Sequence, residues 1–268
     1  MASEERKVDA FLKTRRSMES LGRGLRALHD GVWLGLLDPA ELNQVTRTNY
    51  SSQSSIFLDE DYNLSGPFPW EQSILDRFFA ACKSVLVAAA GGGREVVALA
   101  RRGVRADGFE CNPDLLAKAR ELIERDRLSA NIFPAAADEV PASVGVYDGA
   151  IVGFRAYSHL FGRAARVDFL RELGRHVGPS GPILVSFYLR GPSRRDRIAS
   201  GVANTLRLLR RAEARVEVGD TVYDRFEHWF TAAEIESEIA AAGLCLMHFD
   251  PTSTSHAVAR RPGEPVTV

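Results

Sequence analysis

The chain has 268 residues, of which 45% are hydrophobic and 26% are charged, and its formal net charge is −1. These are the values of an ordinary soluble protein, and the length allows one large α/β domain with an appendage. The near-neutral charge gives no reason to expect a nucleic-acid partner, and no apolar run is long enough to span a membrane.

The three cysteines are scattered along the chain without a CxxC pair. They are Cys82, Cys111 and Cys245. This pattern favours a reducing environment, without disulfides and without a zinc site. Arg15 and Arg16 are not followed by an apolar segment, so they do not resemble an export signal. We therefore expect a cytoplasmic protein without a metal site.

Residues 1–37 are predicted to be helical, because apolar side chains recur there at helical spacing. These side chains are Met18, Leu21, Leu25 and Leu28. Gly22, Gly24 and Gly35 weaken the prediction, since glycine disfavours a helix interior.

Residues 46–70 show no sustained period, and polar residues with interspersed aromatic rings dominate them. Two interpretations remain open. The segment is either a solvated loop whose rings pack on the main domain, or a lid over a bound ligand, as long loops that carry aromatic residues often are. In the second case, Tyr62 and Trp70 cover the ligand.

Residues 84–110 contain the most informative pattern in the chain. The uncharged run from Val85 to Ala90 is typical of a buried parallel strand, and three glycines, 91–93, end it with a sharp turn. A helix over 94–102 and a second strand over 104–109 follow, with Glu110 at the strand's end. The free N–H groups at the helix start favour a negative group, and an acid at that strand end accepts ribose hydroxyls. The pattern predicts an adenosine-containing ligand, and the alternative is a tight turn that binds nothing.

The glycine pattern does not match two kinds of nucleotide site. Val96 stands where a dinucleotide fingerprint needs its third glycine, and no GK[ST] follows the turn. The stretch resembles the first motif of class I S-adenosylmethionine (SAM) methyltransferases, acid-x-Gly-x-Gly-x-Gly. Laid on this sequence, the motif reads Val87-x-Ala89-x-Gly91-x-Gly93, so Val87 replaces the acid and Ala89 the first glycine. The missing acid removes one contact toward the methionine amino group.

Strand and helix patterns alternate from residue 84 to about 260, and a C-terminal hairpin ends them. Further strands are predicted over 130–133, 147–154, 183–189, 222–230, 244–249 and 256–259, and a helix over 163–177. By resemblance, the fold is α/β: a doubly wound, seven-stranded, mostly parallel sheet with an N-terminal helical and lid extension. The expected domains are 1–70 for that extension and 71–268 for SAM binding.

The arginine-rich stretch 190–221 is predicted to be a helical insertion in the second domain. We favour a solvated helix, and the alternative is a positively charged landing patch for an acidic substrate or leader peptide.

The resemblance implies a set of cofactor-binding residues around the turn and the strand ends. They are Ala89, Ala90, Gly91, Gly93, Glu110, Cys111, Asp138, Glu139, Gly153 and Phe154. In the family, an acid at the place of Asp138 accepts the adenine amino group. The alternative is that Asp138 caps a short turn over 139–143.

Three residues emerge at the end of the predicted fourth strand, where open α/β sheets carry their sites: Arg155, Tyr157 and His159. His159 is the best candidate for a general base, because its ordinary pKa lies near neutral. Tyr157 is the second catalytic candidate. The alternative for His159 is a structural role as cap of the helix over 163–177. Tyr62, Trp70, Arg155 and His228 are the expected substrate-binding residues.

These observations predict a SAM-dependent methyltransferase that releases S-adenosyl-L-homocysteine. The expected acceptor is an O or N nucleophile of a small metabolite, a natural-product intermediate or a short peptide, and the protein is a monomer or homodimer. A non-catalytic SAM-binding regulator and, less favoured because of Val96, a dinucleotide-dependent oxidoreductase remain as alternatives. No GxSxG, HExxH or Ser-His-Asp pattern points to another chemistry.

Overall fold

The computed structural model describes residues 22, 24–52, 54–252 and 254–262. Part of the helix predicted over 1–37 lies outside the described residues. Residues 24–36 are helical, in agreement with the prediction. None of the helices within the described ranges is both long and apolar enough to cross a membrane.

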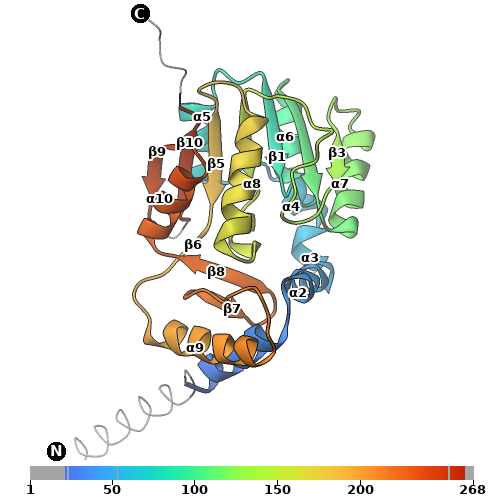
Figure 1. Ribbon diagram of the computed structural model, residues 1–268. Helices are drawn as coiled ribbons and strands as arrows, with labels where there is room; N and C mark the ends of the chain where they lie inside the picture. The colour runs from blue at the N-terminus through green and yellow to red at the C-terminus, as the bar shows by residue number, and fades with distance from the viewer. Residues whose placement is uncertain (1–21, 23, 53, 253, 263–268) are drawn as a thin grey trace, which may run out of the picture.

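A seven-stranded sheet with the strand order β3-β2-β1-β4-β5-β10-β9 forms the centre of the molecule (Figure 1). Its strands are β1 (Ser84–Ala88), β2 (Arg105–Glu110), β3 (Ile132–Pro134), β4 (Gly149–Val152), β5 (Pro182–Ser186), β9 (Cys245–Asp250) and β10 (His256–Arg260). The pairs from β3 to β5 are parallel, and β10 runs antiparallel to both of its neighbours. The predicted seven-stranded, mostly parallel sheet is confirmed.

Helices cover both faces of this sheet, because side chains alternate between the two faces along each strand. Val85 and Val87 pack with α5 (Pro69–Phe78), α6 (Arg94–Arg101) and α7 (Pro113–Arg125). Leu86 and Ala88 pack on the opposite face with α8 (Arg163–Arg175) and α10 (Ala232–Ala241). The result is the three-layered, doubly wound architecture expected from the sequence.

A second, smaller sheet lies below the main sheet in Figure 1, past the carboxyl end of β5. It has the order β6-β8-β7, with β6 at Tyr188–Leu189, β7 at Asp220–Val222 and β8 at Phe226–Phe230. The strand predicted over 183–189 is therefore divided between two sheets, and the one predicted over 222–230 belongs to a hairpin. Local alternation of apolar residues cannot reveal which partner strand a segment meets.

The arginine-rich stretch 190–221 is not a solvated appendage. Its helix, α9 (Arg194–Leu209), packs on the N-terminal helix over 24–36, and the two share an apolar core with the small sheet. Arg207 is 1% exposed and donates hydrogen bonds to the carbonyls of Leu34 and Leu37. Its guanidinium caps the end of the neighbouring helix instead of facing solvent.

The prediction of an irregular segment over 46–70 is wrong for most of its length. The segment contains the end of α2 (Pro39–Ser52), then α3 (Ser54–Phe57), α4 (Glu60–Leu64) and the start of α5. Short helices are marginal by themselves and are stabilised by tertiary contacts, which a sequence period does not record. In α4, the side chain of Asp59 accepts the N–H of Tyr62 as an N-cap.

Gly35 provides a test of the packing between the N-terminal helix and α9. A Cβ at this position would lie 2.8 Å from Cβ of Leu206 and 3.0 Å from the carbonyl oxygen of Ala203, whereas a Cβ at Gly24 meets nothing within 4 Å. Replacing a helical glycine by alanine ordinarily stabilises by about 1 kcal/mol, but overpacking costs about 1–3 kcal/mol. We expect Gly35→Ala to lower the melting temperature and the control Gly24→Ala to leave it unchanged or raise it. Stabilisation by both would contradict this packing.

Candidate active site

A cleft of about 870 Å³, including its open mouth, lies at the carboxyl ends of β1, β2 and β4. This is the edge at which open α/β sheets bind ligands. The N-terminal helices form one wall, through residues that include Tyr50, Phe57 and Tyr62. The glycine turn and the loops after β2 and β4 form the other.

The turn after β1 adopts the left-handed backbone conformation at three positions. The φ angles are 51° at Ala89, 56° at Gly91 and 97° at Gly93. Ala89 tolerates this conformation at a cost of about 1–2 kcal/mol, which a glycine would avoid. The turn also requires a glycine at position 153, because a Cβ there would lie 2.2 Å from the carbonyl oxygen of Ala89. Ala89 and Gly91 line the cleft, while Gly93 is the N-cap of α6.

Glu110 joins this turn to the end of β2. Its buried carboxylate accepts the backbone N–H groups of Gly91 at 2.8 Å, Cys111 at 2.9 Å and Asn112 at 2.7 Å. Burial raises the pKa of this carboxyl, and the three N–H donors oppose the change. Glu110 lines the cleft, as does Cys111. Burial, with the nearby charge of Glu110, raises the pKa of the Cys111 thiol to about 12, so this cysteine stays protonated.

Arg94 anchors the first turn of α6 through a buried ion-pair cluster that sequence reasoning missed. Its guanidinium donates to both oxygens of Glu71, at 2.6 and 2.8 Å, to Glu95 at 2.6 Å, and to the carbonyl of Gly66 at 2.9 Å. Burial raises the pKa of Glu95. The cluster ties α5 and α6 together directly behind the glycine turn.

Asn63 is a second residue that sequence reasoning missed. Its Nδ2 donates to the carbonyls of Phe57 at 2.9 Å and Asp59 at 2.8 Å, so the orientation of the amide is determined. Its buried Oδ1 has no hydrogen-bond partner in the described part of the chain. This oxygen would lie 2.5 Å from a Cβ on Gly92, which explains the middle glycine of the turn. Asn63 thus brings an unsatisfied acceptor to the wall of the cleft.

His159 lies in the cleft, and its hydrogen bonds determine its tautomer. Nδ1 is 2.8 Å from the carbonyl oxygen of Phe226, which can only accept, so Nδ1 carries the proton. Nε2 therefore accepts the hydroxyl of Tyr50 at 2.9 Å. Burial lowers the pKa of His159 and raises that of Tyr50, so both groups are neutral near pH 7. His159 does not cap α8, whose N-cap is Gly162.

Several predicted site residues do not reach the cleft. Tyr157 is buried in the core with α8 and α10, where its hydroxyl donates to Glu238 at 2.7 Å. His228 is buried in the small sheet, with Nδ1 2.6 Å from Asp220. Both side chains pack against Phe230, so they belong to the core and not to the cavity.

Trp70, Arg155, Asp138 and Glu139 also lie outside the cleft lining. Trp70 stacks on His256, and Arg155 faces the ring of Tyr188. Asp138 and Glu139 are exposed, beside Ala137, which does line the cleft. Residues 139–143 form no helix, and a turn lies at 142–143, so the alternative role of Asp138 as the cap of a short turn stays a prediction. Tyr62, Ala90 and Phe154 line the cleft.

Comparison with known proteins agrees with this architecture. Residues 85–181 match the family model of the methyltransferase domain. The solved CcbJ methyltransferase from Streptomyces caelestis is similar at 20% identity and a TM-score of 0.57, over 81% of this chain and 99% of that one. The 1,6-didemethyltoxoflavin-N1-methyltransferase of Burkholderia thailandensis, with S-adenosylhomocysteine bound, is similar at 17% identity and a TM-score of 0.56, over 84% and 91%. The comparison with curated proteins found no match.

The family match and the fold agree. Residues 85–181 carry the methyltransferase domain, and the chain has the fold of the class I methyltransferases, which use S-adenosyl-L-methionine as cofactor. The cleft fits this cofactor, since it combines a glycine turn, a buried carboxylate at the end of β2 and the unsatisfied acceptor of Asn63.

The lowered pKa of His159 predicts a pH dependence of stability. The unfolded chain binds a proton at this histidine near pH 6.5, whereas the folded chain does so only at lower pH. The free energy of unfolding should therefore fall as the pH drops below about 6.5, by up to about 1.4 kcal/mol per pH unit from this group. His159→Gln should reduce that slope in chemical denaturation between pH 7 and 5. His29→Gln, at a side chain that is 50% exposed, is the control. Equal slopes for wild type and His159→Gln would contradict the expectation.

Proposed function

We propose that this methyltransferase transfers a methyl group to an oxygen or nitrogen nucleophile of a small acceptor, with Tyr50 and His159 removing the acceptor's proton. The acceptor class comprises small metabolites, natural-product intermediates and short peptides. The observation that carries the proposal is the neutral Tyr50–His159 pair, which lines the same cleft as the glycine turn.

Bound S-adenosylmethionine supplies a methyl group that its positively charged sulfur already activates. The chain has to hold the acceptor in line with that group and to exclude water. Phe57, Tyr62 and Phe154 line the cleft and provide apolar walls for this purpose. Two of the charged residues in the lining, Arg94 and Glu95, pair with each other.

The proton path follows from the tautomer of His159. An acceptor hydroxyl or ammonium that hydrogen-bonds to the oxygen of Tyr50 gives its proton to that oxygen as the phenolic proton moves to Nε2 of His159. The Phe226 carbonyl keeps Nδ1–H in place and stabilises the imidazolium that forms. The phenol returns to its starting state, and His159 releases the proton after turnover.

The cofactor contacts are assigned to residues on both walls. Glu110, at the end of β2, accepts the ribose hydroxyls. Oδ1 of Asn63 accepts the amino group of the methionine portion and so compensates for Val87, where the family motif has an acid. The support is the buried, unsatisfied oxygen itself, because an acceptor in this position gains a donor only when a ligand binds.

The names of two structural neighbours support a small acceptor. The Burkholderia enzyme is crystallised with 1,6-didemethyltoxoflavin, and CalS10 from Micromonospora echinaspora is an amino pentose methyltransferase involved in calicheamicin biosynthesis. CalS10 is 16% identical, with a TM-score of 0.52 over 80% of this chain and 95% of that one.

The function is tested by calorimetry with SAM and with NAD, followed by measurement of S-adenosylhomocysteine release with a panel of hydroxyl and amine compounds. Binding of SAM and turnover with one acceptor supports the proposal. Binding of SAM without turnover of any acceptor favours a non-catalytic SAM-binding regulator, and binding of NAD alone overturns both.

Glu110→Ala should weaken SAM binding at least tenfold, because each charge-assisted hydrogen bond to a ribose hydroxyl contributes about 1.5–3 kcal/mol. Asn63→Ala should weaken SAM binding severalfold, because it removes the acceptor for the amino group of the methionine portion. Calorimetry gives the affinities for SAM. Melting temperatures show whether a variant has also destabilised the glycine turn. Glu124→Gln, at an exposed acid of α7, is the control. Wild-type affinity in a folded Glu110→Ala protein would remove the ribose assignment.

Tyr50→Phe and His159→Ala should each lower kcat by about 10²–10⁴, the usual contribution of a general base, while the affinity for SAM changes little. The measurement is the rate of S-adenosylhomocysteine formation at saturating SAM and acceptor. Tyr223→Phe removes a hydroxyl from an exposed ring outside the cleft and is the control. An unchanged kcat in both cleft variants would show that the proton leaves by another route.

A further inference from the structure

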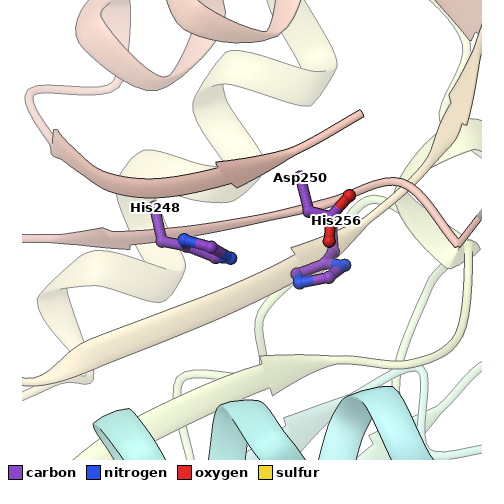
Figure 2. Close-up of side chains that lie close together, drawn as sticks. All are labelled: His248, Asp250 and His256. Atoms are coloured by element: carbon purple, nitrogen blue, oxygen red, sulfur yellow. The ribbon is translucent and has the colours of Figure 1, made fainter. Parts of the chain in front are cut away.

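Three side chains with metal-binding atoms converge on the β9–β10 hairpin, away from the cleft (Figure 2). They are His248, Asp250 and His256, and one ligand atom from each lies within 4.8 Å of the others. His248 and Asp250 are two residues apart on β9, so they share a face of the sheet. In the antiparallel register, His256 on β10 stands directly opposite Asp250. The hairpin therefore brings all three to one face.

The imidazole of His256 has one ring nitrogen without a hydrogen-bond partner among the described residues. It is 2% exposed, and its Nδ1 lies 2.8 Å from the carbonyl oxygen of Thr254, so Nδ1 carries the proton. Nε2 then has a free lone pair, and this buried atom has no hydrogen-bond partner among the residues that the structure describes. The indole of Trp70 stacks on the imidazole with a centroid distance of 4.6 Å and holds its plane.

This arrangement has the pattern of a metal-binding histidine. Such a histidine binds the ion through one ring nitrogen and donates the other N–H to a backbone carbonyl or a carboxylate, which selects the tautomer. A buried acceptor without a donor is otherwise destabilising, so a native structure that contains one calls for an explanation.

We propose that His248, Asp250 and His256 form a binding site for a divalent transition-metal ion, with zinc as the best-fitting ion. Two imidazoles and a carboxylate are a donor set that zinc accepts, with water in the fourth position. His248 and Asp250 are half-buried, which leaves a path for the ion and for that water. Ligand atoms around tetrahedral zinc lie about 3.3 Å apart. When the ion binds, the side chains of His248 and Asp250 therefore move slightly closer to His256.

The electrostatic surroundings are compatible with this site. The pKa of His248 is lowered by burial, by His256 and by Arg77, so its imidazole is neutral and available near pH 7. The pKa of Asp250 is lowered chiefly by its hydrogen bonds to Thr252, and its carboxylate offsets the charge of an incoming cation.

The position of the site indicates a structural role. β9 is the edge strand of the main sheet, and an ion held by side chains of both strands connects it to β10. None of the three residues lines the cleft, so the proposal is independent of the acceptor and of the proposed proton path. The lack of paired cysteines led to the prediction of no metal site, but a site of this kind depends on strand register and not on a CxxC spacing.

The test is titration of the chelator-treated full-length protein with zinc chloride, followed by calorimetry and by the melting temperature. Wild type should bind one zinc ion at this site and should melt several degrees higher when it is saturated. The cobalt(II) form should show the visible absorption of a four-coordinate site. His248→Gln and Asp250→Asn, both at half-buried positions that tolerate substitution, should each lose at least tenfold in affinity and most of the gain in melting temperature.

His256→Gln should abolish binding, and His29→Gln, at the N-terminal helix, is the matched control. Zinc binding that is absent in wild type, or equally strong in wild type, His248→Gln and Asp250→Asn, would overturn the proposal. The last result would place the ion at other side chains of the molecule.

Discussion

The buried guanidinium of Arg94 is the interaction on which the geometry of the cleft depends. It links α6, which begins directly after the glycine turn, to Glu71 on α5 and to the carbonyl of Gly66. Removal of one partner would leave an uncompensated buried charge, which typically costs about 3–5 kcal/mol. The turn is therefore held from behind by a charge cluster and from the front by the carboxylate of Glu110.

The same cluster explains how the N-terminal helices become part of the site. The ring centroid of Phe68 lies 4.0 Å from the guanidinium carbon of Arg94, and Asn63 packs against Gly92. These contacts place α4 against the turn, so that one wall of the cleft is built from residues that precede the methyltransferase domain. Helix α4 is thus a built-in part of the cleft wall.

Tyr50 and His159 connect the parts of the molecule at the other end of the cleft. His159 follows β4, Tyr50 lies on α2, and the carbonyl that orients His159 belongs to β8 in the small sheet. The backbone N–H of the same residue, Phe226, donates to Thr46 on α2. The small sheet, which the core of a class I fold does not require, therefore determines the tautomer and position of the candidate base.

The sequence alone determined the parts of this protein that depend on local chemistry. Apolar runs that end in glycine, the N-cap of Asn112 and the capping box of Thr231 and Glu234 act within a few residues, and the structure contains each of them. The order of these elements, together with the resemblance to class I methyltransferases, predicted the main sheet, its C-terminal hairpin and the position of Glu110.

Only the tertiary structure decided which side chains meet. Helix α4 forms where it packs on α6 and on the glycine turn, although the periodicity of the surrounding sequence is weak. Asn63 and Tyr50 reach the cleft, whereas Tyr157 and His228, equally suitable by residue type, face the core instead. The reason is physical: a hydrogen bond such as that between Tyr50 and His159 joins residues 109 positions apart. Its existence depends on the packing of whole elements, which no short stretch of sequence contains.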